Sequence, residues 1–91
     1  MEVLRAAIIA ELDAINLYEQ LAAAATNENI KKVLLEIAGE EKTHVGEFQT
    51  LLLKEDKEQV EELEKGRKEV EGIMKLGKSR KRYKLEITFY F

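Results

Sequence analysis

The 91-residue chain contains no cysteine, no proline and no tryptophan. Without cysteine it forms no disulfide, no thiolate-bound zinc site and no cysteine-ligated iron–sulfur cluster. Without proline, and with only five glycines, long helices meet few interruptions. We also find no signal peptide and no apolar run of about 18 residues, the length that would cross a membrane. We therefore expect a cytoplasmic protein with no membrane partner.

Charge is abundant but nearly balanced. Charged residues make up 36% of the chain, and the formal net charge is -3. Because nucleic-acid-binding domains are usually basic, this mild acidity predicts no nucleic-acid partner. The length corresponds to one small domain with a marginal core, so we expect oligomerisation to add stability.

Two segments, residues 2–26 and 30–54, carry a regular stripe of mostly apolar residues in alternating steps of four and three. Such spacing is typical of the buried face of a packed helix. The first stripe is Leu4, Ile8, Glu11, Ile15, Tyr18, Ala22 and Ala25. The second is Ile30, Leu34, Ile37, Glu41, His44, Phe48 and Leu51. Residues 26–29 favour turns and helix caps, which predicts an antiparallel helical hairpin.

Three residues in these stripes, Glu11, Glu41 and His44, are polar where packing favours apolar side chains. In a hairpin that turns near residues 27–28, Glu11 lies level with His44, so all three share one layer of the core. A carboxylate there is costly unless it is paired or bound to an ion. The layer therefore predicts a bound cation.

The ligand types narrow the choice of metal. Glu41 and His44 lie three residues apart on one helix face, and Glu11 faces them. Oxygen and nitrogen ligands without sulfur suit iron(II), manganese(II) or zinc(II). Di-iron carboxylate bundles use two Glu-x-x-His pairs and two further glutamates, twice the set found in this chain. We therefore predict an all-α fold in which two hairpins form a four-helix bundle by homodimerisation and share two metal ions.

Other interpretations of these residues stay open. The layer is alternatively a structural one that fixes helix register. Glu40, four residues before His44, is an alternative ligand to Glu41. Tyr18, seven residues after Glu11, is either a partner of a ligand carboxylate with a redox role or a core aromatic.

The rest of the chain is less regular. We predict a shorter third helix at about residues 57–75, with a thin apolar face, ending at Gly77. A basic run at 78–82 precedes alternating apolar residues up to Phe91, which is strand periodicity. We predict a helical domain at 1–77 and a basic linker with a strand-like tail at 78–91, which is either disordered or paired with a partner.

Two motifs resemble those of encapsulated ferritins, especially archaeal members. Ile9-Ala10-Glu11-Leu12-Asp13-Ala14-Ile15-Asn16-Leu17-Tyr18 is similar to the first-helix motif of that family, and Glu40-Glu41-Lys42-Thr43-His44 is similar to the second. The resemblance covers residues 3–54 well and 55–75 loosely, and rubrerythrin-type proteins share parts of it. It identifies domain 1–77 as ferritin-like.

The resemblance implies a ferroxidase centre at a dimer interface, with Glu11, Glu41 and His44 of each subunit as iron ligands and Tyr18 beside them. It also implies a ring of five dimers inside an encapsulin nanocompartment, whose shell stores the oxidised iron. The chain departs from the family at two positions. Ala10 stands where members with a secondary metal-entry site are acidic, which leaves Asp13 as the only candidate for such a site, and Leu17 stands where an aromatic residue sometimes precedes the tyrosine. The tail resembles no shell-targeting peptide, although some archaeal members are fused to the shell protein.

The function predicted from these residues is oxidation of iron(II) to iron(III) for iron storage or detoxification. The first alternative is a rubrerythrin-like peroxidase, which would need an external electron donor because the chain lacks cysteine. The second is a non-catalytic helical adaptor with a polar core layer. The sequence leaves open the oxidant, dioxygen or peroxide, and the metal, iron, manganese or zinc.

Overall fold

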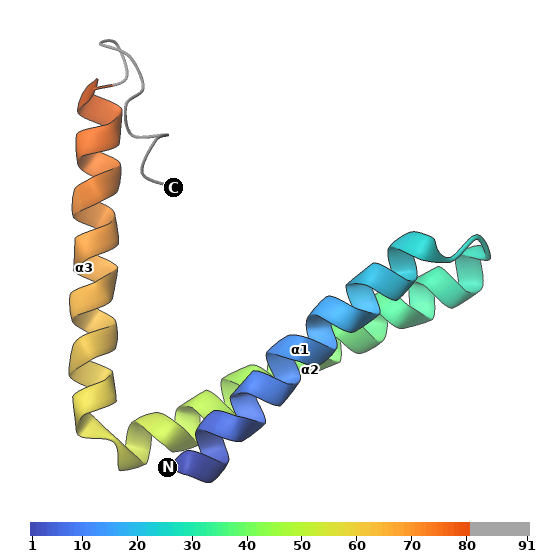
Figure 1. Cartoon of the computed structure of the whole chain (residues 1–91), viewed down its shortest axis with the longest axis horizontal. Coiled ribbons are helices and arrows are strands. Elements are labelled where there is room, and N and C mark those ends of the chain that lie inside the picture. Colours follow the sequence, from blue (N-terminus) through green and yellow to red (C-terminus); the bar gives the residue numbers. More distant parts are fainter. Residues whose placement is uncertain (81–91) are drawn as a thin grey trace. The chain divides into compact units, whose positions relative to one another are not determined.

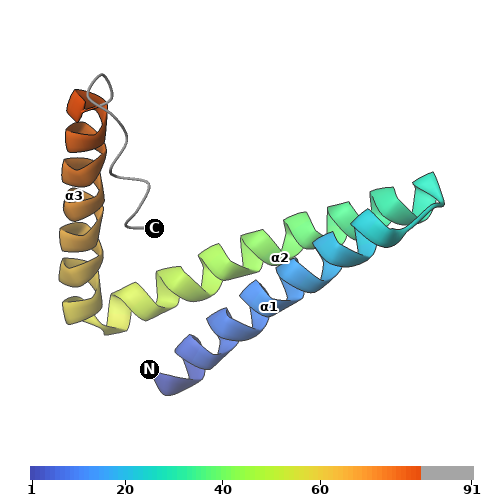
Figure 2. The ribbon, with the colours of Figure 1, turned by 45° about the horizontal axis from the view of Figure 1, so that its top comes forward.

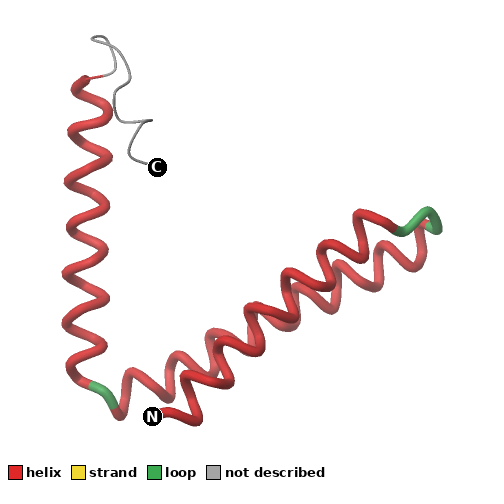
Figure 3. Tube along the Cα trace, viewed as in Figure 1, coloured by secondary structure: helices red, strands yellow, loops and turns green. Residues whose placement is uncertain are grey.

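The computed structural model describes residues 1–80, and in that range the chain is entirely helical apart from short connections. The helices are α1 (Glu2–Ala24), α2 (Glu28–Glu55) and α3 (Lys57–Arg80) (Figure 3). The predicted all-α class is confirmed. The strand predicted towards Phe91 lies outside the described residues.

Helices α1 and α2 form the predicted antiparallel hairpin and run side by side along their lengths (Figures 1 and 2). The connection begins at Ala25, whose extended backbone ends α1. Asn27 then caps α2, because its Oδ1 accepts hydrogen bonds from the backbone N–H groups of Asn29 at 2.9 Å and Ile30 at 3.1 Å. This cap satisfies donors that the first turn of a helix leaves unpaired.

The hairpin core is thin. All seven stripe positions of α1 are buried or half-buried, as predicted. The predicted buried stripe of α2 is wrong at its two ends, because the side chains of Ile30 and Leu51 are 54% and 51% exposed. The line that faces α1 runs instead through Ala38 and Leu52, which are 2% and 6% exposed. Helix α2 therefore carries two adjacent lines of apolar residues, one through Ala38 and Leu52 and one through Ile30 and Leu51. Sequence spacing alone does not show which of the two lines faces α1.

The second apolar line belongs to an exposed side of the hairpin, which we call the open face. Its large apolar side chains are 44–79% exposed. They are Val3, Leu17 and Leu21 of α1 and Ile30, Val33 and Leu51 of α2. In the sequence, each of these six residues comes directly before a residue on the line of its helix that faces the other helix. In an antiparallel helix pair, the same displacement along both sequences leads to the same side of the pair.

Helix α3 differs from the prediction in its length. It spans 24 residues and ends at Arg80, whereas α1 has 23 residues, so α3 is not the shorter helix. Gly77 does not end it. A glycine inside a helix costs only about 1 kcal/mol relative to alanine, which neighbouring good helix formers offset.

The chain divides into two compact units, Met1–Asp56 and the segment that begins at Lys57. The hairpin and α3 are therefore described separately. The boundary between a helical domain at 1–77 and a tail at 78–91 stays a prediction. None of the described helices is long and apolar enough to cross a lipid bilayer.

Candidate metal centre

The structure brings Glu11, Glu41 and His44 together midway along the hairpin. One potential ligand atom from each residue lies within 4.8 Å of the others. His44 Nδ1 lies 3.1 Å from Glu11 Oε2 and 3.7 Å from Glu41 Oε2. The predicted polar layer is therefore present, with side chains from both helices.

The local sequence explains this geometry. Glu41 and His44 project from adjacent turns on one side of α2 because they are three residues apart. Glu11 meets them because it lies on the line of α1 that faces α2. Ile15 and Ala38, about one turn from the layer, are 9% and 2% exposed. These tightly packed neighbours fix the register of the two helices at this level.

The three side chains are unequally exposed. The side chains of Glu11 and Glu41 are 20% and 18% exposed, whereas that of His44 is 44% exposed. His44 precedes the packed residue Val45 by one position, so it lies on the same flank as the open face. The carboxylates thus lie inside the hairpin, and the imidazole stands where the site meets the open face.

Hydrogen bonding and charge shift the proton affinities of two of these groups. The pKa of Glu41 is raised, first by its hydrogen bond with Glu11 and then by partial burial and the Glu11 charge, although His44 opposes the shift. The pKa of His44 is raised by its hydrogen bond to Glu11 and by the charges of Glu11, Glu41 and Glu47, against partial burial. Protons therefore compete with a metal ion for Glu41 and His44 at a higher pH than they do at isolated side chains.

The donor set fits a divalent transition metal ion. It comprises two carboxylates and one imidazole, without sulfur, which suits iron(II), manganese(II) or zinc(II). Three side chains fill about half of the positions around an octahedral ion. A second set of ligands or solvent is needed to complete the coordination.

The other candidate residues lie outside this cluster. Glu40 is exposed and is not grouped with His44, so the geometry favours Glu41 as the ligand. Tyr18 is half-buried on the face of α1 that carries Glu11, and its role stays a prediction. Asp13 is exposed, and two residues from Glu11 it points away from the cluster.

Sequence reasoning missed two electrostatic features near the cluster. Lys42 Nζ lies 3.2 Å from Glu19 Oε2, on the side of the hairpin opposite the open face. Glu47 is exposed, but its charge contributes to the raised pKa of His44. Its position three residues after His44 is a sequence signal for that influence.

Comparison with known proteins agrees with this arrangement. The family described as Rubrerythrin matches residues 2–88. A "Ferritin-like-encapsulin shell fusion protein" from Pyrococcus furiosus is 63% identical over 73 residues, which are 80% of this chain and 21% of that protein. The chain thus corresponds in length to about a fifth of that fusion protein.

A solved structure is similar to this chain in both sequence and fold. The crystal structure of an encapsulated ferritin domain from Pyrococcus furiosus has a TM-score of 0.78 and 62% sequence identity, covering 79% of this chain and 74% of that chain. The resemblance to encapsulated ferritins found in the two helix motifs is thereby confirmed. Because the family match extends over most of the sequence, the chain belongs to the rubrerythrin family of ferritin-like proteins.

Proposed function

We propose that this protein is a ferroxidase that oxidises iron(II) at a site shared by two copies of the chain. The observation that carries the proposal is the convergence of Glu11, Glu41 and His44, whose ligand atoms lie within 4.8 Å of one another. One hairpin offers half of the ligand set of a di-iron carboxylate bundle. Two hairpins related by a twofold axis supply the whole set.

The open face supports this dimer. Its large apolar side chains are about half-exposed or more, and they flank the side of the cluster on which His44 lies. Large apolar side chains gathered on one side of a helix pair often mark a surface that another chain covers. A second hairpin on the open face would cover it, complete a four-helix bundle and bring the two ligand sets together.

The site would hold two iron(II) ions as substrate, each of which gives one electron to dioxygen or peroxide. We assign nitrogen ligation to His44 and carboxylate ligation to Glu41 and Glu11, either of which could be shared between the two ions. The chain contributes carboxylate charge that stabilises iron(III), and protons compete with the metal for Glu41 and His44, whose pKa values are raised. Tyr18 lies on the same helix face and is our candidate for a hydrogen bond to a ligand carboxylate.

The relatives support a proposal about assembly and location. One Pyrococcus furiosus relative is described as a ferritin-like–encapsulin shell fusion protein, and the solved structure is an encapsulated ferritin domain from the same organism. By analogy, we propose that this chain works in the cytoplasm within an encapsulin nanocompartment, as a ring of dimers such as a decamer. The shell would store the oxidised iron.

A rubrerythrin-like peroxidase is the second candidate, favoured by the family match over residues 2–88. The chain lacks the cysteines of a rubredoxin-type iron site, so this activity would need an external reductant. Turnover with peroxide and a reductant, compared with iron oxidation in air, distinguishes the two activities.

Anaerobic titration of the metal-free protein with iron(II) tests the proposal. We expect saturation at about one iron per chain, two per dimer, because each hairpin supplies half of a di-iron ligand set. Exposure to air should then produce iron(III) absorbance at a rate above that of iron in buffer. The absence of saturable binding would contradict the proposal and leave the polar layer structural.

A further inference from the structure

His44 presents one of its two ring nitrogens to the metal centre. Its Nδ1 lies 3.1 Å from Glu11 Oε2 and 3.7 Å from Glu41 Oε2. The other nitrogen, Nε2, makes no hydrogen bond or ion pair with the residues that the structure describes. A metal ion held by the two carboxylates would therefore meet Nδ1 as its nitrogen ligand.

The choice of nitrogen determines where the imidazole proton lies. A neutral imidazole carries one N–H, and a metal binds the nitrogen that lacks it. Ligation through Nδ1 therefore requires the proton on Nε2, where it is a hydrogen-bond donor. Metal-bound histidines almost always give this N–H to a carboxylate, a backbone carbonyl or water, which fixes the tautomer and the orientation of the ring. Glu11 and Glu41 lie on the Nδ1 side of the ring, so the partner of Nε2 is a different group.

Glu47 is the carboxylate best placed to accept this hydrogen bond. It follows His44 by three residues on α2, so the two side chains are neighbours on the helix surface. Side chains lean towards the N-terminus of their helix, so Glu47 leans back over the turn that carries His44, whereas Glu40 leans away from it. Among the described residues outside the cluster, Glu47 is also the one whose charge raises the pKa of His44.

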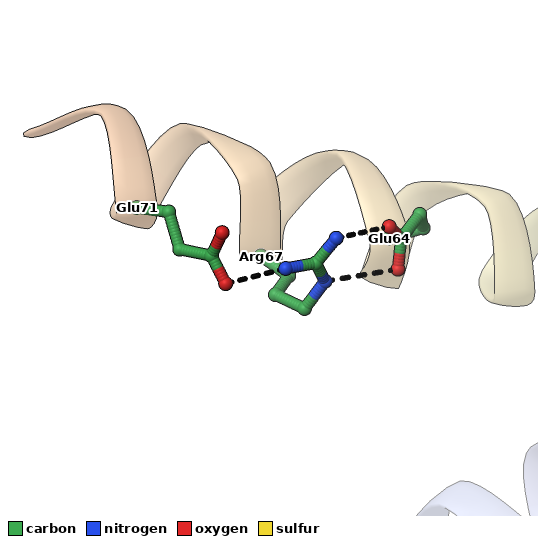
Figure 4. Close-up of polar contacts among 3 residues, drawn as sticks. All are labelled: Glu64, Arg67 and Glu71. Atoms are coloured by element: carbon green, nitrogen blue, oxygen red, sulfur yellow. Dashed lines mark hydrogen bonds and ion pairs between the residues drawn. The ribbon is translucent and has the colours of Figure 1, made fainter.

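Contacts at this spacing occur elsewhere in the chain. Glu41 Oε2 and His44 Nδ1, 3.7 Å apart, belong to residues three positions apart. In α3, Arg67 Nε donates to Glu64 Oε2 at 3.1 Å across the same spacing (Figure 4). Both side chains of the α3 pair are 51% exposed, so a glutamate on an open helix surface reaches a donor three residues away without support from packing. Glu47 and His44 have the same separation.

We propose that Glu47 is a positioning residue for the metal centre, whose carboxylate accepts a hydrogen bond from His44 Nε2–H and holds the ring with Nδ1 towards the metal. The inference rests on the proposed function, because it requires a metal ion bound by Glu11, Glu41 and His44. Glu47 itself does not touch the metal. Its role is to stabilise the one tautomer of His44 in which Nδ1 is free to bind.

The zinc(II) affinity of full-length Glu47 variants is the first test. Zinc(II) has no redox chemistry and accepts the same oxygen and nitrogen ligands. We expect Glu47→Ala to bind zinc(II) about tenfold more weakly than the wild type, at the low end of the usual range for such partners because Glu47 is exposed. Glu47→Gln should lie between the two, because its amide oxygen still accepts a hydrogen bond but carries no charge.

The matched control is Glu40→Ala, which removes an exposed carboxylate four residues before His44. This variant should bind zinc(II) like the wild type, and circular dichroism checks that every variant keeps its helices. Equal losses of affinity in Glu47→Ala and Glu40→Ala would overturn the proposal, because any nearby negative charge would then serve. Equal losses in Glu47→Ala and Glu47→Gln would also overturn it, because charge rather than a hydrogen bond would explain them.

Nitrogen-15 NMR gives a readout that a purely structural role would not change. The chain has one histidine, so the imidazole signals belong to His44 alone. In the zinc-loaded wild type we expect zinc on Nδ1 and an observable proton on Nε2. In Glu47→Ala this proton signal should be lost by exchange with water, because the His44 side chain is 44% exposed. Zinc on Nε2, or an unchanged Nε2–H signal in Glu47→Ala, would overturn the proposal.

Failure of this inference differs from failure of the proposed function. A wild-type protein that binds neither iron(II) nor zinc(II) saturably would overturn both. A wild-type protein that binds metal through Nδ1, with Glu47→Ala binding equally well, would overturn only the role of Glu47.

Discussion

His44 Nδ1 lies 3.1 Å from Glu11 Oε2, although 33 positions separate the two residues in the sequence. The contact exists only because the turn at residues 25–27 sets the register of α1 against α2. A shift of one residue would turn either side chain by about 100° around its helix and separate the pair. The hairpin thus determines the site, and the predictions below test the two together.

Replacement of Glu41 by glutamine should abolish saturable iron(II) binding. Glutamine keeps the shape of the side chain but removes the charge, and the cluster loses one of its two carboxylates. The matched control is Glu40→Gln, one position away and exposed, which should bind iron like the wild type. Anaerobic titration measures both, and retained binding in Glu41→Gln together with loss in Glu40→Gln would transfer the ligand role to Glu40.

Iron(II) affinity should fall as the pH is lowered. The pKa values of Glu41 and His44 are raised, so protons compete with the metal at a higher pH than for isolated side chains. The affinity should decline as the pH falls through the raised pKa of His44, above 6.5, and then through that of Glu41, above 4.5. Titrations at a series of pH values measure this decline, and a flat profile across that range would contradict it.

The stability of the metal-free protein should depend on pH in the opposite direction. A group whose pKa is raised by folding binds its proton more tightly in the folded state, so it stabilises the fold when protonated. The contribution of His44 is complete below pH 6.5 and is lost as the pH rises through its raised pKa. Thermal unfolding across this range should show a falling Tm.

The variant His44→Asn is the control for this pH dependence. Its Tm should fall less than that of the wild type over the same interval, since asparagine does not titrate. Equal slopes for the two proteins would mean that other groups cause the pH dependence.

Helix capping at Asn27 should contribute measurably to the stability of the hairpin. Its Oδ1 accepts hydrogen bonds from Asn29 and Ile30, and replacement of such a cap by alanine typically costs about 1 kcal/mol. Urea unfolding of Asn27→Ala measures this loss. Asn29→Ala, which keeps the cap, should change stability little, and equal losses in the two variants would argue against capping as the cause.

Sequence patterns predicted the hairpin and the convergence of Glu11, Glu41 and His44, because both depend on strong local signals. The turn residues and the four–three spacing set the register, and Glu11, Glu41 and His44 stand out as polar residues in apolar stripes. The predictions from these patterns were wrong where the local signal was weak or where two patterns overlapped on one helix. Because α2 carries two neighbouring apolar lines, the spacing did not show that Ile30 and Leu51 are exposed. Helix α3 continues past Gly77 because a glycine inside a helix destabilises it only modestly.

Dimerisation through the open face should be lost in Leu17→Lys. Leu17 is 51% exposed in the single chain, and a lysine there would place a charge inside the proposed four-helix bundle. The matched control is Gln20→Lys, which adds the same charge on the exposed side of α1 away from α2. Light scattering should detect smaller particles for Leu17→Lys alone, while circular dichroism shows unchanged helix content.

Iron chemistry should follow the loss of the dimer. One hairpin retains Glu11, Glu41 and His44, so a separated chain still offers three ligands, but it lacks the second set needed to hold two iron ions together. We therefore expect Leu17→Lys to oxidise iron(II) no faster than buffer, and Gln20→Lys to match the wild type. Full oxidation by a Leu17→Lys protein shown to be monomeric would mean that the single hairpin is sufficient and that the site is not shared between chains.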